Sequence, residues 1–161
     1  HKRDHESFLA AMKGLRYRGV VVTDRHIGAP VPSNCDIYGQ MPLLDYVSLM
    51  AKSRFVVVPL LAGDVPHGHG DIAIALSLGK PVVTTRGASV EQYAQDNYNA
   101  IIVDPGDVAG YRIAIESLFA DENLFSDLAN GASKSQALFS YEMFAENICK
   151  CINDARKDRN C

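Results

Sequence analysis

The chain has 161 residues and a formal net charge of -3 at pH 7, with 47% apolar and 22% charged residues. A domain of this length buries roughly 70% of the surface of its unfolded chain, so we expect one domain over residues 1–161. The charge balance gives no reason to expect binding to nucleic acid. No apolar run approaches the ~20 residues of a membrane-spanning helix, and residues 1–15 lack a signal-peptide core. We therefore expect a cytoplasmic protein.

The four cysteines indicate neither a metal site nor a disulfide framework. They are Cys35, Cys149, Cys151 and Cys161, and no two of them form a CxxC pair. Cys149 and Cys151 are two residues apart in an expected helix and point to nearly opposite sides of it. We therefore expect reduced thiols without a functional role.

The first part of the chain alternates between helical and strand-like patterns. Phe8, Leu9, Met12 and Leu15 are spaced as one face of a helix. Pro42 suits the first turn of a second helix, and "RFVVVPLL" is a continuous apolar run, typical of a strand covered on both faces. In chain order, the patterns predict a helix over 6–15, strands over 17–24 and 35–39, a helix over 42–53 and a strand over 54–61.

The same alternation continues in the second part. A helix over 71–79 ends at Gly79, and "KPVVTT" follows as a strand. The remaining predictions are a helix over 89–96, a strand over 99–104, a helix over 108–121, and only helix over 122–158, as two helices that meet near 139–143.

This alternation predicts right-handed βαβ units and therefore a doubly wound parallel α/β sheet of the Rossmann-like kind. The chain opens on a helix, whereas such a sheet normally opens on a central strand. Either the opening strand lies upstream of His1 or the sheet is unusually arranged, and we expect the chain to be a fragment of a longer protein whose opening strand is missing here.

In an open α/β sheet, ligands bind beyond the carboxyl ends of the strands. The loop "AGDVPHGHGD" (62–71) occupies such a place. Its glycines let the backbone approach a ligand, and the N-terminus of the next helix favours an anion, so a phosphate or diphosphate would fit. The alternative is that the glycines only allow a turn and that Asp71 caps the helix.

Other chemistries are poorly supported. The sequence has no GxGxxG after a strand, no GxxxxGK[ST] and no G-x-S-x-G. His67 and His69 are two residues apart in a loop with no HExxH motif and no cysteine nearby, which is only a weak signal for a metal site. We expect one of the two imidazoles to donate a hydrogen bond to a ligand phosphate or sugar hydroxyl, and we predict no metal and no cofactor.

The segment from "RFVVVPLL" to "NAIIVDPGD" resembles the C-terminal, donor-binding half of retaining glycosyltransferases with the GT-B fold, the group-one family. The motif positions are held here by Pro59, Gly79, Lys80, Pro81, Val82, Val83, Glu91, Asp96, Asn99, Val103, Pro105 and Asp107. The resemblance implies that a nucleotide-diphosphate sugar is the donor substrate. It also implies that an N-terminal domain, absent from this sequence, binds the acceptor and provides any association with a membrane surface.

The resemblance also implies roles for individual residues. Arg3, with Lys2 beside it, corresponds to a basic residue that contacts the donor diphosphate. The segment with Tyr38, Gly39 and Gln40 corresponds to the part that lines the nucleotide base. In the Gly-rich loop, His67, Gly68, His69, Gly70 and Asp71 would face the donor, and no catalytic residue is assigned.

The family commonly carries two glutamates around this loop, and this chain has Pro66 and Ile74 in those places. Asp71 is one turn before Ile74 on the same helix face, so our hypothesis is that Asp71 makes the ribose contact in place of the missing glutamate. The alternative function is a non-catalytic module, either a degenerate GT-B half or a flavodoxin-like interaction domain. A nucleotide-sugar epimerase of the same fold is a third option.

Overall fold

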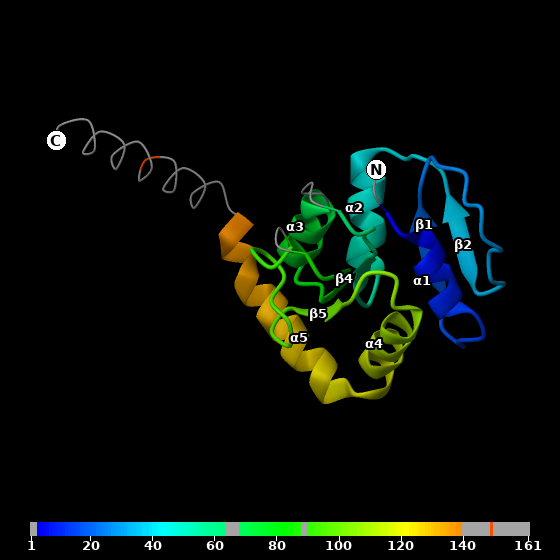
Figure 1. The fold of residues 1–161 in the computed structure, drawn as a ribbon. Helices are drawn as coiled ribbons and strands as arrows, with labels where there is room; N and C mark the ends of the chain where they lie inside the picture. Colours follow the sequence, from blue (N-terminus) through cyan, green and yellow to red (C-terminus); the bar gives the residue numbers. More distant parts are fainter. Residues whose placement is uncertain (1–2, 64–67, 88–89, 140–148, 150–161) are drawn as a thin grey trace.

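A computed structural model describes residues 3–63, 68–87, 90–139 and 149 (Figure 1). The helices are α1 (His5–Met12), α2 (Leu43–Lys52), α3 (His69–Ser77), α4 (Val108–Ala120) and α5 (Glu122–Ser135), followed by a short 3₁₀ helix (Gln136–Phe139). The strands are β1 (Gly19–Val22), β2 (Cys35–Tyr38), β3 (Val56–Val58), β4 (Val82–Thr85) and β5 (Ala100–Val103). The expected order is confirmed for all of these elements, and the prediction for 140–158 lies outside the described residues except at Cys149, which is helical.

All strand ladders among the described residues are parallel. β1 pairs with β2, Gly19 opposite Cys35, and β4 lies between β3 and β5, with Val82 opposite both Val56 and Ala100. Parallel neighbours require crossover connections: α3 provides the one between β3 and β4, whereas the described residues between β1 and β2 and between β4 and β5 form loops and turns. The α/β fold class is thus confirmed.

Alternate residues of β4 belong to two different parts of the core. Val82 packs with Ile72 and Leu76 of α3, whereas Val83 packs with Tyr111 and Leu118 of α4. Because successive side chains of a strand point to opposite faces, α3 and α4 cover opposite faces of the β3–β4–β5 sheet, as Figure 1 also shows. All four residues of β4 are buried.

Aspartates begin several of the helices. The Asp4 carboxylate accepts from the Ser7 amide, the Asp107 carboxylate from the Gly110 amide, and the Asp121 carboxylate from the amides of Asn123 and Leu124. Each bond satisfies an N–H group that has no partner inside its helix. These caps fix where α1, α4 and α5 start.

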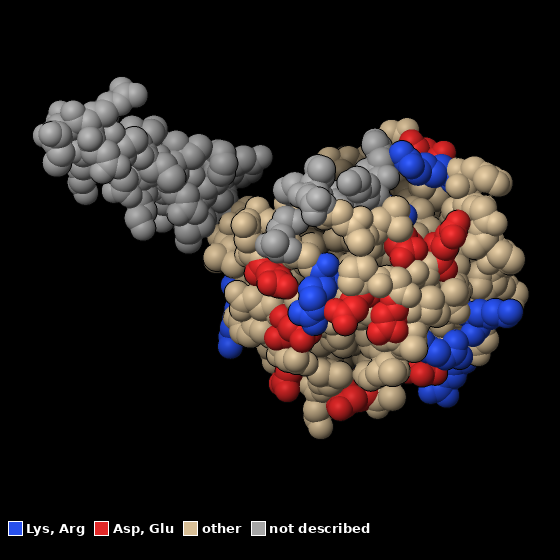
Figure 2. Space-filling view, viewed as in Figure 1, with Lys and Arg blue, Asp and Glu red and all other residues tan. Residues whose placement is uncertain are grey.

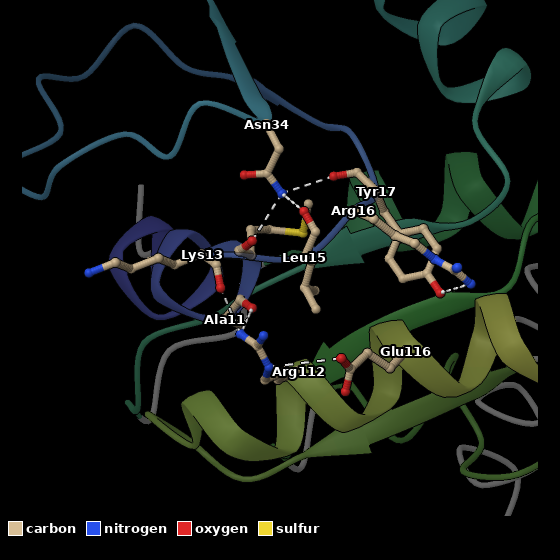
Figure 3. A network of polar contacts seen from close by, with 9 residues as sticks. Ala11, Lys13, Leu15, Arg16, Tyr17, Asn34, Arg112 and Glu116 are labelled. Atoms are coloured by element: carbon tan, nitrogen blue, oxygen red, sulfur yellow. Dashed lines mark hydrogen bonds and ion pairs between the residues drawn. The ribbon is translucent and has the colours of Figure 1, made fainter.

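Two side chains hold the end of α1 (Figure 3). Nδ2 of Asn34 lies within 3.0 Å of the carbonyl oxygens of Met12, Leu15 and Tyr17. The guanidinium of Arg112, on α4, donates to the carbonyls of Ala11 and Lys13. The last carbonyls of a helix lack intrahelical partners, so these contacts anchor α1 to the start of β2 and to α4.

The helix predicted over 89–96 is wrong in the described part of that segment, residues 90–96, which forms turns. The side chain of Asn99 accepts from the Gln95 amide and donates to the Tyr93 carbonyl. The Gln95 carbonyl in turn accepts from the amides of Tyr98, Asn99 and Ala100. Asn99 therefore folds the backbone back into β5 where a helix would have to continue.

The described strands form two ladders rather than one continuous sheet. Between them lies a cavity of about 450 Å³, lined by Val20–Val22 of β1 and Val56–Val58 of β3. We call this cavity the β1–β3 groove. Within the described residues, every helix is too short or too polar to cross a bilayer.

Candidate functional site

The first turn of α3 forms the centre of the candidate site. Gly68, the residue before α3, has φ of +87°. A Cβ there would lie 2.9 Å from Cδ2 of Leu60. Both the left-handed backbone and the close side chain therefore require glycine at this position.

No described side chain caps the N-terminus of α3. The first bond from the helix to its N-cap runs from the Ile72 amide to the Gly68 carbonyl, at 3.1 Å. The N–H groups of His69, Gly70 and Asp71 come before that bond and point out of the helix end. The alternative that Asp71 caps α3 is therefore wrong. This helix end combines amides that have no intrahelical partner with a positive dipole end and suits an anion.

The Asp71 carboxylate instead binds two residues from other elements. Arg3 Nη2 forms an ion pair with Oδ2, and Tyr46 of α2 donates to Oδ1 at 3.0 Å. The Arg3 and Asp71 side chains are 24% and 26% exposed. Asp71 thus connects α3 to α2 and to the start of the described chain, and it holds the Arg3 guanidinium beside the open end of α3.

Burial sets the protonation of the groups around this pair. Burial, followed by the charge and hydrogen bond of Asp71, raises the pKa of Tyr46 well above its ordinary value, so its hydroxyl remains a donor. Burial, with Arg3 nearby, lowers the pKa of His5 from 6.5. His5 is therefore mainly neutral at pH 7, and Arg3 provides the positive charge here.

His69 is the first residue of α3, and its ring lies 5.2 Å from the ring of Tyr93. Its Nε2 is buried and has no hydrogen-bond partner among the described residues. A buried polar atom of this kind is satisfied once a ligand or water reaches it. Lys2, Pro66 and His67 lie outside the described residues, so His69 is the one member of the histidine pair that the structure describes.

Tyr38, Gly39 and Gln40 are exposed where β2 ends, and Tyr38 is 49% exposed. Across the described ranges, no hydrogen bond or ion pair joins them to Arg3 or to Gly68–Asp71. The structure thus brings Arg3, Gly68, His69, Gly70 and Asp71 together, whereas Tyr38, Gly39 and Gln40 follow from another element, β2, and make no bond to them among the described residues.

Sequence reasoning missed Tyr46, the residue that completes the Asp71 contact. Tyr46 is one helical turn before the buried Met50, so its place on the inner face of α2 could have been read from the spacing. The distribution of surface charge does not mark the site. On the face in Figure 2, Lys and Arg are interspersed with Asp and Glu, without a continuous basic area.

Comparisons with known proteins agree with this architecture. The sequence profile of the family "Glycosyl transferases group 1" matches residues 6–121. The chain is 25% identical over 126 residues to the uncharacterised glycosyltransferase MJ1178 of Methanocaldococcus jannaschii, a match of 78% of this chain and 33% of that protein.

Two solved structures share the fold. HepE of Anabaena, crystallised with UDP-glucose, has a TM-score of 0.77 and 19% identity, covering 95% of this chain and 45% of that one. Sucrose-phosphate synthase of Thermosynechococcus elongatus has a TM-score of 0.76 and 18% identity, covering 98% and 43%.

The chain therefore spans a third of the length of its curated relative and under half of each of these solved chains. The family profile covers more than half of this chain, and the fold is that of GT-B glycosyltransferases. The chain belongs to the group 1 glycosyltransferase family.

Proposed function

We propose that this chain is the donor-binding domain of a glycosyltransferase that transfers a sugar from a nucleotide-diphosphate sugar. The observation that carries the proposal is the open N-terminus of α3 with the Arg3 guanidinium fixed beside it. A structural neighbour crystallised with UDP-glucose supports this class of donor. An N-terminal domain outside this sequence would bind the acceptor, so the isolated chain is expected to bind donor weakly and to transfer no sugar.

The proposed chemistry follows from the charge that builds up on the leaving diphosphate. Amides at a helix end and a guanidinium stabilise developing negative charge, and both are in place before the donor arrives. Arg3 would contact the phosphates from one side, and the amides of His69 and Gly70 from the other. Nε2 of His69 would donate to a phosphate or sugar hydroxyl in the tautomer that carries its proton there.

We further propose that Asp71 accepts a ribose hydroxyl. Each of its oxygens has one described partner, and a carboxylate oxygen has a second lone pair. In that case Asp71 has two tasks: it orients Arg3, and it takes the contact that the family assigns to a glutamate. Lys2, Tyr38, Gly39, Gln40 and His67 complete the proposed donor site.

Calorimetry with UDP, GDP and ADP, followed by Arg3→Ala on the best ligand, tests the diphosphate site. We expect at least tenfold weaker binding, because a charge-assisted contact is lost. Arg18→Ala is the matched control: Arg18 directly precedes β1 and also pairs with a carboxylate, that of Asp36 on β2, rather than with a residue of α3. No binding by the intact protein to any nucleotide, or equal losses in both variants, would favour the non-catalytic module.

A second titration separates the two tasks of Asp71. Asp71→Asn should weaken the binding of UDP, or of the nucleotide that binds best, more than the binding of inorganic diphosphate, because only the nucleotide has a ribose. If both ligands change by the same factor, Asp71 acts only through Arg3 and the ribose assignment is wrong.

A further inference from the structure

The orientation of the Asp71 carboxylate depends on two side chains from different parts of the fold. Arg3 Nη2 is paired with Oδ2, and the Tyr46 hydroxyl donates to Oδ1 at 3.0 Å. The last torsion of an aspartate side chain is broad, so a single partner would leave the carboxylate free to turn with it. Partners on both oxygens fix the plane of the carboxylate, so the position of one partner sets the direction in which the other is held.

Tyr46 is the more rigid of these two partners. It is the fourth residue of α2, its amide donates to the Pro42 carbonyl at 3.1 Å, and its ring is half-buried. Met50, one helical turn later, is 6% exposed, so this face of α2 points inward. A tyrosine side chain has two torsions and ends in a stiff ring, so its hydroxyl has a defined position once α2 is packed.

Arg3 is the flexible partner. Its backbone is held by the bridge to Leu60 and, at the next residue, by the bond from the Asp4 amide to the Pro59 carbonyl at 3.0 Å. The long side chain beyond that backbone has far more rotamer freedom than a tyrosine. Its described ion pair is the one with Asp71. The positioning effect therefore runs from Tyr46 through Asp71 to the Arg3 guanidinium.

The Tyr46 hydroxyl fixes Asp71 without adding a charge. Burial, followed by the charge and the hydrogen bond of Asp71, raises the pKa of Tyr46, so the hydroxyl stays protonated and donates to the carboxylate. A second cation at this place would compete with Arg3 for the carboxylate and would leave the guanidinium less well held. A neutral donor keeps the carboxylate in place and leaves its charge to Arg3.

We propose that Tyr46 is a positioning residue of the donor site: its hydroxyl fixes Asp71, and Asp71 then directs the Arg3 guanidinium toward the N-terminus of α3. The effect on ligand binding rests on the proposed function, whereas the order of the Arg3 side chain exists without a ligand. A guanidinium that is already ordered loses less conformational entropy when an anion binds. Tyr46 therefore raises the affinity for a diphosphate through Arg3, without a contact of its own.

The first test measures the mobility of Arg3 in the intact protein without ligand. Tyr46→Phe keeps the ring and removes only the hydroxyl. We expect the NMR order parameter of Arg3 Nε to fall in this variant, because the carboxylate can then turn together with the guanidinium. Tyr17→Phe is the matched control and should leave Arg3 unchanged, because the Tyr17 hydroxyl accepts from Arg16 Nη2 at 3.4 Å in an exposed contact. Equal order of Arg3 in the wild type and in Tyr46→Phe would overturn the proposal.

Calorimetry with inorganic diphosphate measures the consequence for binding. Tyr46→Phe should weaken binding by about three- to tenfold, the cost of ordering one long side chain. It should weaken binding no further in the Arg3→Ala background, because the effect runs through Arg3. An unchanged affinity in Tyr46→Phe, or an equal loss with and without Arg3, would overturn the proposal. If the wild type binds neither diphosphate nor any nucleotide, the proposed function fails, whereas a more mobile Arg3 in Tyr46→Phe still supports the positioning role.

Discussion

β4 and β1 have similar sequences, VVTT and GVVV, but very different surroundings. β4 has a strand on each side and a helix layer on each face, and all four of its residues are buried. Among the described residues β1 pairs with one strand, and its burial alternates, with Val20 at 42% exposed and Val21 at 5%. Short β-branched runs therefore predict that a strand forms, whereas the neighbouring elements decide whether its edges and faces are covered. We call the β3–β4–β5 sheet with α3, α4 and α5 the closed half, and the β1–β2 ladder with α1 the open half.

The largest expected effect lies in the closed half, at Gly131 of α5. A Cβ there would lie 1.8 Å from the carbonyl oxygen of Tyr98. Two backbones meet at this point and neither can yield, so Gly131→Ala should lower the free energy of unfolding by more than about 3 kcal/mol. In the control, Gly70→Ala, nothing lies within 4 Å of the added Cβ. Urea unfolding of both variants checks this, and a stable Gly131→Ala protein would contradict the packing of α5.

A matched pair of valines compares the two halves directly. Val83→Ala leaves a cavity at a fully buried position of β4 and should lower the free energy of unfolding by about 2 kcal/mol. Val20→Ala removes methyl groups that already contact solvent and should cost about 0.5 kcal/mol. Equal costs would mean that the groove is closed in solution.

The polar contacts that join β3 to β4 give the next effect. Oγ1 of Thr85 accepts from the Leu60 amide at 2.7 Å and lies 2.6 Å from the Tyr111 hydroxyl. Thr85→Val keeps the shape but leaves a buried N–H without a partner, at a cost of about 1.5 kcal/mol. Thr23→Val is the control, because the hydroxyl of the half-buried Thr23 also accepts from a backbone amide, that of Arg25 at 3.2 Å, in a solvent-exposed bond. An unchanged unfolding midpoint for Thr85→Val would contradict this contact.

Tyr111 adds a pH dependence to the closed half. Burial raises its pKa to about 12, against an ordinary value of 10. Between these values the folded protein holds a proton that the unfolded chain has released, so the free energy of unfolding falls as pH rises through this window. Tyr111→Phe should flatten the curve between pH 9 and pH 12 in urea titrations. An unchanged slope would mean that the hydroxyl is hydrated.

The smallest effect belongs to the open half, at His5 in the groove. Burial lowers its pKa, so the unfolded chain binds a proton at a higher pH than the folded protein. The free energy of unfolding should therefore decrease as pH falls below 6.5, and His5→Gln should remove part of that decrease. His26, which is exposed, is the control position. The same slope in both variants would contradict the burial of His5.

Periodicity predicted the order of the elements because each buried stripe is local in sequence. It failed at 89–96, since the side chain of Asn99, which follows the segment, folds the backbone into turns. The glycine-rich helix end was predictable from Gly68 and Gly70, whereas the contacts of Asp71 with Arg3 and Tyr46 were not. They join residues 68 and 25 positions apart, and no local pattern encodes such pairs.

The most direct test of the proposed function is backbone amide NMR of the chain during titration with a UDP sugar and its GDP and ADP equivalents. We predict the largest saturable shifts at Gly68, His69, Gly70 and Asp71, together with a change at the Arg3 guanidinium. Shifts centred on Val20 and Val57, or no saturable shift with any nucleotide sugar, would contradict donor binding at the N-terminus of α3.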